Sequence, residues 1–271
     1  MLELTPQQLA SADIALMNLL CAKGIPGAES LDIPAALKRL DEWAAKVKVE
    51  TERHLYRVTD PKFADHYNHS EARLRAEFIV QTLQEDCGVH YNMERVRNVD
   101  FSNPKDMFIL GMIDDANGGT CASMPVLYVA IGRRLGYPMK LALAKQHVYC
   151  RWEGTTEKLN IEGAANGGID FPPDDYYGTW PEPISDEEMA TGEFLRGLTP
   201  SEELSMFMLN RGCCHHAREE FAAAVACFAE SHRLMPNAIG PKVAVSTAME
   251  RKPMPGQQTQ VTRNSRKGNK S

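Results

Sequence analysis

Residues 118–138 read GGTCASMPVLYVAIGRRLGYP, and the predicted architecture follows from them. The first three residues are turn formers, whereas residues 121–135 are apolar nearly all round and predict a helix buried in the core. Gly136 and Pro138 end this helix, because glycine favours the left-handed cap and proline cannot continue the helical backbone. Cys121 is therefore expected in the first turn of a buried helix.

Two strands are predicted directly after this helix. Residues 139–152 alternate well enough to form a strand, and residues 158–161 form another after a short turn. A helix followed by a strand hairpin, with helical segments on both sides, predicts an α+β fold. The other helices are expected at residues 5–21, 34–56, 71–85 and 103–115, and from residue 186 to about residue 251.

The C-terminal helical region contains a repeat-like pattern. Within residues 205–238, Gly212, Ala224, Phe228 and Pro236 stand 12, 4 and 8 residues apart, as in a single tetratricopeptide-like helical hairpin. One such hairpin cannot bury its own apolar face, so it is expected to dock on the main domain or on a protein partner.

The bulk composition suits one large domain with a small appendage. The chain has 271 residues, of which 43% are hydrophobic, and a formal net charge of -6. This charge gives no reason to expect specific binding to nucleic acid. Residues 251–271 are polar and carry basic but no acidic residues, which predicts a disordered basic tail.

The sequence also predicts a compartment. It shows neither a basic leader followed by an apolar stretch nor an apolar run of membrane-spanning length. The seven cysteines form an odd set without the spacing of a disulfide framework, which favours free thiols in a reducing environment. We therefore expect a cytoplasmic protein without a membrane span.

Cys121 is the candidate nucleophile. Unpaired amide groups and the positive end of the helix dipole favour thiolate over thiol at such a position, and the N–H of Cys121 itself can bind an oxyanion. Gly118 and Gly119 let the loop approach closely, and Thr120 is available as a cap. The alternative is a small, inert core cysteine, which is the more common role of a buried thiol.

A histidine and two possible orienting residues accompany this cysteine. His147 lies in an otherwise apolar predicted strand, where an imidazole is costly unless it is hydrogen-bonded. Asn160 and Glu162 follow two residues apart on the next strand, so they share one face and either can hold the ring. Nucleophile, base and orienting group are the parts that thiol acyl transfer requires.

These segments resemble a known family. GGTCASMPVLYVAIGRRLGYP, KQHVYCRW and LNIEGAANGG are similar to the transglutaminase-like superfamily, in particular to a bacterial branch in which tetratricopeptide-type helices often follow the core. The resemblance implies a papain-like α+β arrangement, in which a central cysteine-bearing helix packs on an antiparallel sheet. It also implies that Cys121 is the nucleophile, His147 the general base and Glu162 the acid.

Two positions depart from the family pattern. Glu162 stands where the family usually has aspartate, so its longer side chain must tilt to meet the imidazole, and Asn160 could replace it as asparagine does in papain-like enzymes. The usual aromatic or amide donor to the oxyanion is not evident just before the cysteine. Only Asn117 is a candidate there, beside the loop residues Gly119 and Thr120.

The resulting hypothesis is a cysteine-dependent enzyme that acts on amide bonds of a protein or peptide, with hydrolysis favoured over cross-linking. The competing hypothesis is a catalytically degenerate transglutaminase-like domain that binds a protein partner through its helical hairpin. The expected units are an N-terminal helix (1–30), a transglutaminase-like domain (31–198), tetratricopeptide-like helices (199–250) and the tail (251–271).

No metal or other cofactor is expected. Residues 213–216 read CCHH, but four consecutive helical residues point around the whole circumference and cannot close on one ion. Tyr176, Tyr177 and Trp180 lie in a predicted acidic loop, which either packs on its own aromatic rings or lines the mouth of a substrate site.

Overall fold

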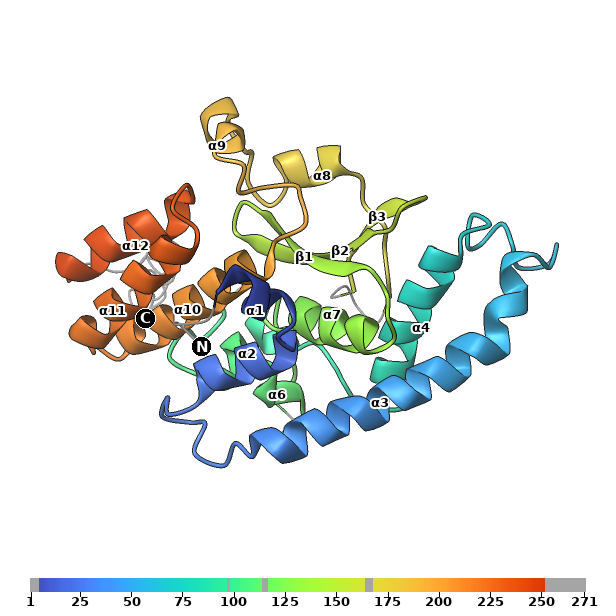
Figure 1. Cartoon of the computed structure of the whole chain (residues 1–271), viewed down its shortest axis with the longest axis horizontal. Coiled ribbons are helices and arrows are strands. Elements are labelled where there is room, and N and C mark those ends of the chain that lie inside the picture. The colour runs from blue at the N-terminus through green and yellow to red at the C-terminus, as the bar shows by residue number, and fades with distance from the viewer. Residues whose placement is uncertain (1–4, 97, 114–116, 164–167, 252–271) are drawn as a thin grey trace, which may run out of the picture.

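The protein combines many helices with one small antiparallel sheet (Figure 1), which confirms the predicted α+β class. The computed structural model describes residues 5–96, 98–113, 117–163 and 168–251. The predicted basic tail therefore lies outside the described residues, apart from Arg251. Within those ranges, no helix has the length and apolar character needed to cross a membrane.

Short and long helices alternate around the three strands. Two of the short ones, η1 and η2, are 3-10 helices. The bounds in chain order are α1 (Pro6–Ala10), α2 (Ile14–Ala22), α3 (Ile33–His54), η1 (Leu55–Val58), α4 (Glu71–Glu85), η2 (Met93–Arg95), α5 (Pro104–Met107), α6 (Leu110–Ile113), α7 (Met124–Arg134), β1 (Met139–Ala144), β2 (His147–Glu153), β3 (Lys158–Ile161), α8 (Asp174–Thr179), α9 (Asp186–Ala190), α10 (Pro200–Ala217), α11 (Phe221–Leu234) and α12 (Ile239–Met249).

Helix α7 forms the centre of the molecule. Its first nine residues are all buried, as its continuous apolar sequence predicts, and α2, α3, α4 and the sheet pack around it (Figure 1). Arg133 at its C-terminal end donates to Glu203 of α10 at 2.9 Å. Arg134 pairs with Asp13, the N-cap residue of α2, so two arginines tie the central helix to its neighbours.

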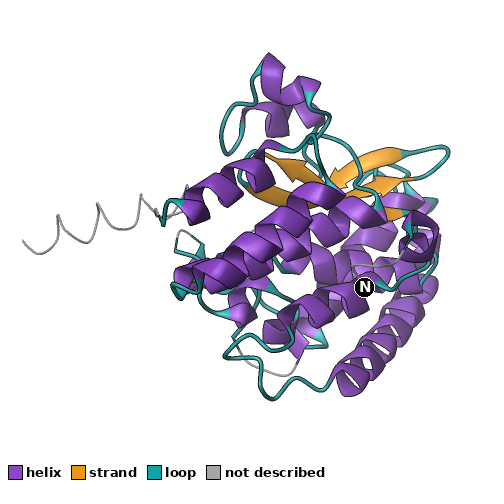
Figure 2. Cartoon of the chain, turned by 60° about the vertical axis from the view of Figure 1, so that its left-hand side comes forward, coloured by secondary structure: helices purple, strands orange, loops and turns teal. Residues whose placement is uncertain are grey.

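The sheet has the strand order β1-β2-β3, with all pairs antiparallel. A two-residue turn joins β1 to β2, with Gln146 in the left-handed region at φ 63° and Ala144 opposite His147. One face of the sheet, including Cys150, packs on α7, and the other, including Tyr149, packs on α8. Figure 2 shows the strands on one side of a largely helical body.

The predicted C-terminal hairpin forms from α10 and α11. Gly212 is needed at their crossing, because a Cβ there would lie 2.3 Å from the ring of Phe228. Ser205 and Ser231 add a buried hydrogen bond between the two helices. Helix α10 also packs on α2, and its apolar residues join the core that surrounds α7. The hairpin therefore docks on the rest of this chain.

Several predicted helix bounds are wrong. The helix expected at residues 5–21 is two helices, because Asp13 caps a new start at Ile14. The segment 103–115 also holds two short helices, α5 and α6. The central helix begins at Met124 instead of Cys121, and α8 lies in a segment predicted as a loop.

Candidate active site

The side chains of His147 and Glu162 form a close buried pair at the edge of the sheet. His147 Nε2 lies 2.6 Å from Glu162 Oε2, and the two side chains are 7% and 14% exposed. Glu162 directly follows β3 and exchanges two backbone hydrogen bonds with Asp170, which fixes its main chain. Tyr177 donates its hydroxyl to the same Glu162 oxygen at 3.1 Å, so the carboxylate has two partners that hold it in place.

Cys121 stands beside this pair. It lies in a hydrogen-bonded turn just before α7, because the carbonyl of Thr120 accepts from the N–H groups of Ser123 and Met124. The thiol of Cys121 lies close enough to the His147 ring to raise the pKa of that ring, and Cys121 is partly exposed to solvent. Since Nε2 of His147 is bonded to Glu162, Nδ1 is the ring nitrogen that remains for the thiol.

The environment of His147 favours its protonated form. Burial of the ring is the largest single influence and lowers its pKa. Hydrogen bonds to Cys121 and Glu162, together with the negative charge of Glu162, outweigh burial and raise the pKa of His147 to about 9. At neutral pH the ring therefore carries a positive charge between a carboxylate and a thiol.

Tyr91 completes the group and was not predicted from the sequence. Its phenol lies close enough to Cys121 for both the backbone and the thiol of that residue to act on the pKa of Tyr91. Burial, followed by the negative charges at Cys121 and Glu162, raises the pKa of Tyr91, so the phenol keeps its proton. A neutral phenol and a backbone N–H at one sulfur are two donors of the kind that stabilise an oxyanion.

Backbone pairing brings Tyr91 to the nucleophile. The segment around it runs parallel to the loop before Cys121, with Gly119 N–H bonded to the His90 carbonyl at 2.9 Å. The N–H of Asn92 in turn donates to the Gly119 carbonyl at 2.8 Å. This contact joins residues about 30 positions apart and has no periodic signature in the sequence.

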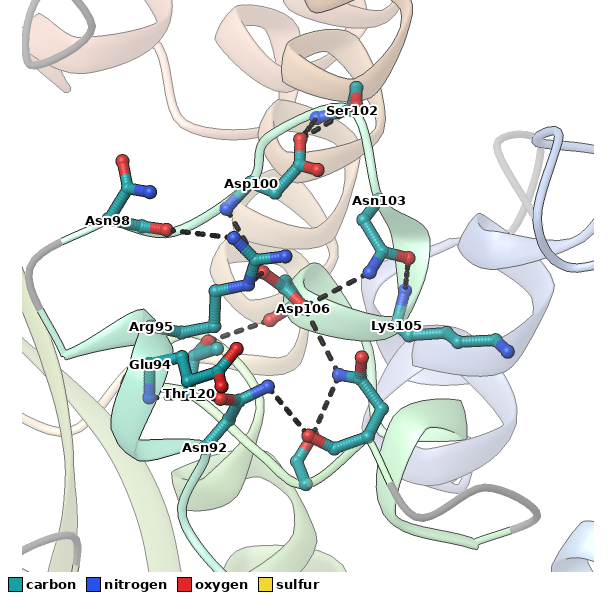
Figure 3. A network of polar contacts seen from close by, with 12 residues as sticks. Asn92, Glu94, Arg95, Asn98, Asp100, Ser102, Asn103, Lys105, Asp106 and Thr120 are labelled. Carbon is teal, nitrogen blue, oxygen red and sulfur yellow. Dashed lines mark hydrogen bonds and ion pairs between the residues drawn. The ribbon is translucent and has the colours of Figure 1, made fainter. Parts of the chain in front are cut away.

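A buried carboxylate, Asp106, lies at the centre of a polar network that holds the same loop (Figure 3). Its side chain is 0% exposed and forms an ion pair with Arg95 at 3.0 Å. Asp106 also accepts hydrogen bonds from Asn103 and Asn117, and its backbone carbonyl accepts from the hydroxyl of Thr120 at 2.7 Å. The network joins α5, η2 and the turn that carries Cys121.

The predicted oxyanion-loop residues have contacts that shape this turn. Asn117 donates its side-chain amide to Asp106 and to the Gly118 carbonyl. Gly119 has no room for a side chain, because a Cβ there would lie 2.3 Å from Met124. The N–H of Thr120 donates to Ser123 Oγ at 3.0 Å. All three residues have polar groups bonded within the loop or to its neighbours, and the phenol of Tyr91 lies beside Cys121.

Asn160, the alternative orienting residue, has other partners. Its side-chain N–H groups donate to Asp174 at 2.8 Å and to the Pro172 carbonyl at 3.0 Å, and its oxygen accepts from Arg151. Asn160 therefore braces the sheet against α8 and does not orient His147. Asn160 and Glu162 both contact α8, through Asp174 and Tyr177, so they share one face as the strand period predicts.

Aromatic rings from α8 and the residue after it flank His147. Tyr177 is fully buried and stacks on Tyr149 with ring centroids 3.9 Å apart. Trp180 meets the His147 ring edge-on at 4.8 Å and remains 40% exposed. The segment thus packs on its own rings and also borders the candidate site.

The six other cysteines have environments that keep them protonated. Burial raises the pKa of each, to about 12 for Cys21 and Cys213. The other four, for which the direction is the same, are Cys87, Cys150, Cys214 and Cys227. Over the described ranges, no group of three or more His, Cys, Asp or Glu side chains is placed to hold a metal ion.

Comparisons with protein-family models, with curated proteins and with solved structures found no significant match to this chain. The geometry of the site is therefore the basis on which a function can be argued. It brings together Cys121, His147 and Glu162 from three separate segments and adds Tyr91 from a fourth.

Proposed function

We propose that this chain is a cysteine-dependent acyl-transfer enzyme of the transglutaminase-like, papain-like class, which acts on amide bonds of proteins or peptides. The observation that carries the proposal is the thiol of Cys121 beside the His147 ring, whose Nε2 is bonded to Glu162 at 2.6 Å. Nucleophile, base and orienting acid in this order are what catalysis through a thioester needs.

The first half of the reaction follows from these positions. The protonated His147 ring stabilises a thiolate at Cys121, whose sulfur attacks the amide carbonyl and forms a carbon–sulfur bond. The carbonyl oxygen takes up the negative charge, and the Cys121 N–H and the Tyr91 phenol donate to it. When the carbon–nitrogen bond breaks, His147 gives its proton to the leaving amine.

Water is the proposed acceptor in the second half. His147 takes a proton from water, the hydroxide attacks the thioester carbon, and the acid product leaves as the carbon–sulfur bond breaks. Transfer to an amine instead requires a site that keeps water out. Partial exposure of Cys121 and Trp180 supports access of water, and therefore supports hydrolysis over cross-linking.

The position of Glu162 supports the enzyme proposal over the binding-module hypothesis. That hypothesis rested on glutamate in place of aspartate at position 162. The longer side chain reaches His147 Nε2 at 2.6 Å and is also bonded to Tyr177, so its length is accommodated. We therefore favour the enzyme.

Selective alkylation tests the proposal. Native protein is treated briefly with iodoacetamide at neutral pH, and each cysteine is followed by peptide mass mapping. Cys121 should react at least about tenfold faster than any other thiol, because the others are protonated or buried. In guanidinium chloride all seven should react at similar rates. Faster modification of another cysteine in the native protein, with Cys121 unmodified, would remove the basis of the proposal.

Cleavage of a general substrate tests the activity itself. Wild-type protein should release peptides from fluorescein-labelled unfolded casein, and Cys121→Ala should abolish the release. Cys87→Ala is the matched control, because Cys87 is also partly exposed but has no histidine partner among the described residues. Equal release by wild type and Cys121→Ala would exclude Cys121 as the nucleophile.

A further inference from the structure

The segment that flanks the candidate site is strongly acidic. Residues 170–195 contain eight aspartate or glutamate residues and no lysine, arginine or histidine. Acidic segments on protein surfaces are commonly only solvated, so the charge alone assigns nothing. Its placement beside exposed aromatic rings and the candidate catalytic base is what distinguishes this one.

Two exposed rings stand next to the base. Tyr176 and Trp180 stack on each other with centroids 5.3 Å apart and are 41% and 40% exposed. Trp180 also contacts the ring of His147 at 4.8 Å. Large aromatic side chains usually bury most of their surface, so a half-exposed stacked pair at a reactive centre is a surface suited to a ligand.

Exposed carboxylates lie in the same segment as these two rings. Asp170 is paired through its backbone with Glu162, and the charges of Glu162 and Asp170 act on the Tyr176 phenol. Asp175 is the exposed neighbour of Tyr176 in α8. Glu182 accepts a hydrogen bond at 2.7 Å from Gln146, the residue that precedes His147.

The cations close to this surface are already engaged. Arg151 pairs with Asp174 at 2.7 Å, and Lys145 pairs with Glu188 at 2.9 Å. Arg73 lies over the ring of Phe171 at 4.6 Å, at the far end of the segment from Trp180. The protonated ring of His147, which touches Trp180, is paired with Glu162, so the exposed charges of Asp175 and Glu182 give the surface around Tyr176 and Trp180 a negative field.

From the stacked rings and the charge around them, we infer that the substrate carries a cationic side chain, arginine or lysine, next to the amide that Cys121 attacks. The inference rests on the proposed function and names its substrate class. A guanidinium or ammonium group placed on the faces of Tyr176 and Trp180 gains a cation–π contact, and Asp175 and Glu182 attract it.

Thiol reagents of one size and opposite charge test this inference. Methanethiosulfonates transfer an alkylthio group to a thiolate and release methanesulfinate. The relative modification rates of a cationic and an anionic reagent therefore report the electrostatic potential at the Cys121 sulfur. Each rate is divided by the rate of the same reagent with free 2-mercaptoethanol. At low salt, the cationic trimethylammonium-ethyl reagent should then modify Cys121 at least about tenfold faster than the anionic sulfonatoethyl reagent. The preference should shrink in 1 M salt, where charges are screened.

Two double variants test whether Asp175 and Glu182 cause the preference for the cationic reagent. Asp175→Asn with Glu182→Gln should lower the cation-to-anion rate ratio at least about threefold. Glu42→Gln with Glu52→Gln removes the same charge from exposed positions on α3, which lies across α7 from the sheet, and should leave the ratio unchanged (Figure 1). An equal fall in both double variants would overturn the inference.

A matched ligand pair tests recognition directly. Nα-acetyl-arginine amide should slow modification of Cys121 by the neutral methyl reagent, whereas the citrulline analogue, which has similar shape but no charge, should not. The Tyr176→Ala variant should weaken this protection. Equal protection by both compounds, or by neither, would contradict a cationic substrate.

The outcomes separate the inference from the proposed function. Rapid modification of Cys121 by the neutral reagent without charge preference would reject the cationic substrate and leave the acyl-transfer proposal standing. Failure of all three reagents at Cys121, while Cys87 reacts, would reject both.

Discussion

At the scale of single residues, one carboxylate oxygen, Glu162 Oε2, fixes the position of the catalytic imidazole in the proposed site. Glu162 Oε2 accepts from both His147 and Tyr177, and the second donor prevents the longer glutamate side chain from swinging away. The other polar neighbour of the imidazole, Cys121, comes from a different segment, the turn before α7. The geometry therefore depends on a few contacts with defined donors.

The role of Tyr91 can be tested by removing one oxygen atom. Tyr91→Phe should lower kcat for casein cleavage about 100-fold, the usual effect of losing one oxyanion donor, with little change in KM. The free energy of unfolding should fall by no more than about 1 kcal/mol, because the ring remains. Tyr56→Phe, at an exposed phenol, is the control. An unchanged kcat would exclude the phenol from the oxyanion site.

Site residues that belong to a local turn or strand pattern could be predicted from the sequence. Site residues that are placed by pairing with a distant segment could not. Cys121 follows a glycine-rich turn, and His147 and Glu162 lie in or just after strands whose alternation is readable in the sequence. Tyr91 reaches the site only through parallel backbone pairing with Gly119, which leaves no periodic pattern. Asn117 was chosen for its position in the sequence, but Asp106 binds its side chain.

At the scale of elements, the turn that carries Cys121 depends on the network around Asp106. Asp106→Asn keeps the shape of the side chain but leaves Arg95 without its charged partner. We expect a loss of about 3 kcal/mol in the free energy of unfolding, as for other broken buried pairs. Alkylation of Cys121 should also slow, because the side chain of Asp106 binds Asn117 in the loop that precedes this cysteine.

Urea unfolding and iodoacetamide kinetics measure the two effects. The control is Asp65→Asn, whose side chain is 96% exposed. If Asp106→Asn changed neither stability nor the alkylation rate, the network would not position the nucleophile.

The crossing of α10 and α11 predicts a second effect on stability. In Gly212→Ala the new methyl group would lie 2.3 Å from the Phe228 ring, so the helices must separate. Overpacking of this kind costs about 1–3 kcal/mol, which thermal unfolding can detect. Gly240→Ala is the matched control in α12, where the nearest atom would be 3.8 Å away. Equal effects of the two substitutions would contradict the close packing.

Helices with strong periodicity were predicted well, and short helices were not. The bounds of α4 agree with the prediction, because Ser70 caps its start and its apolar residues repeat at helical spacing. Helix α7 starts three residues later than predicted, since Thr120 and Ser123 bond within a separate turn. Helix α8 consists of residues typical of loops, and buried contacts of Tyr177 stabilise it.

At the scale of the whole molecule, the core is continuous across the predicted units. Apolar residues of α2, α7 and α10 belong to one buried cluster, so the C-terminal hairpin shares its interior with the helix that follows Cys121. The division into units at residues 30, 198 and 250 stays a prediction. The continuous core arises from docking, which periodicity within one segment cannot reveal.

Protonation of His147 should make stability depend on pH. Its pKa in the folded state is about 9, above the ordinary value of 6.5, so folding favours the protonated ring. The contribution is fully present below pH 6.5 and is lost as the pH rises through 9, with a size of up to about 3 kcal/mol.

Urea unfolding of wild type and His147→Gln from pH 6 to pH 10 measures this contribution. The difference in the free energy of unfolding between the two proteins should shrink as the pH rises. A difference that is constant or grows over this range would contradict the raised pKa.

The most direct test of the site is the titration of His147 itself. In protein labelled with ¹⁵N-histidine, the NMR signals of this ring are expected to show both nitrogens protonated until about pH 9. Glu162→Gln should move the midpoint to lower pH, because it removes the negative charge at Nε2. A wild-type midpoint at or below the ordinary 6.5, unchanged in Glu162→Gln, would contradict the arrangement of Cys121, His147 and Glu162 on which the proposed function depends.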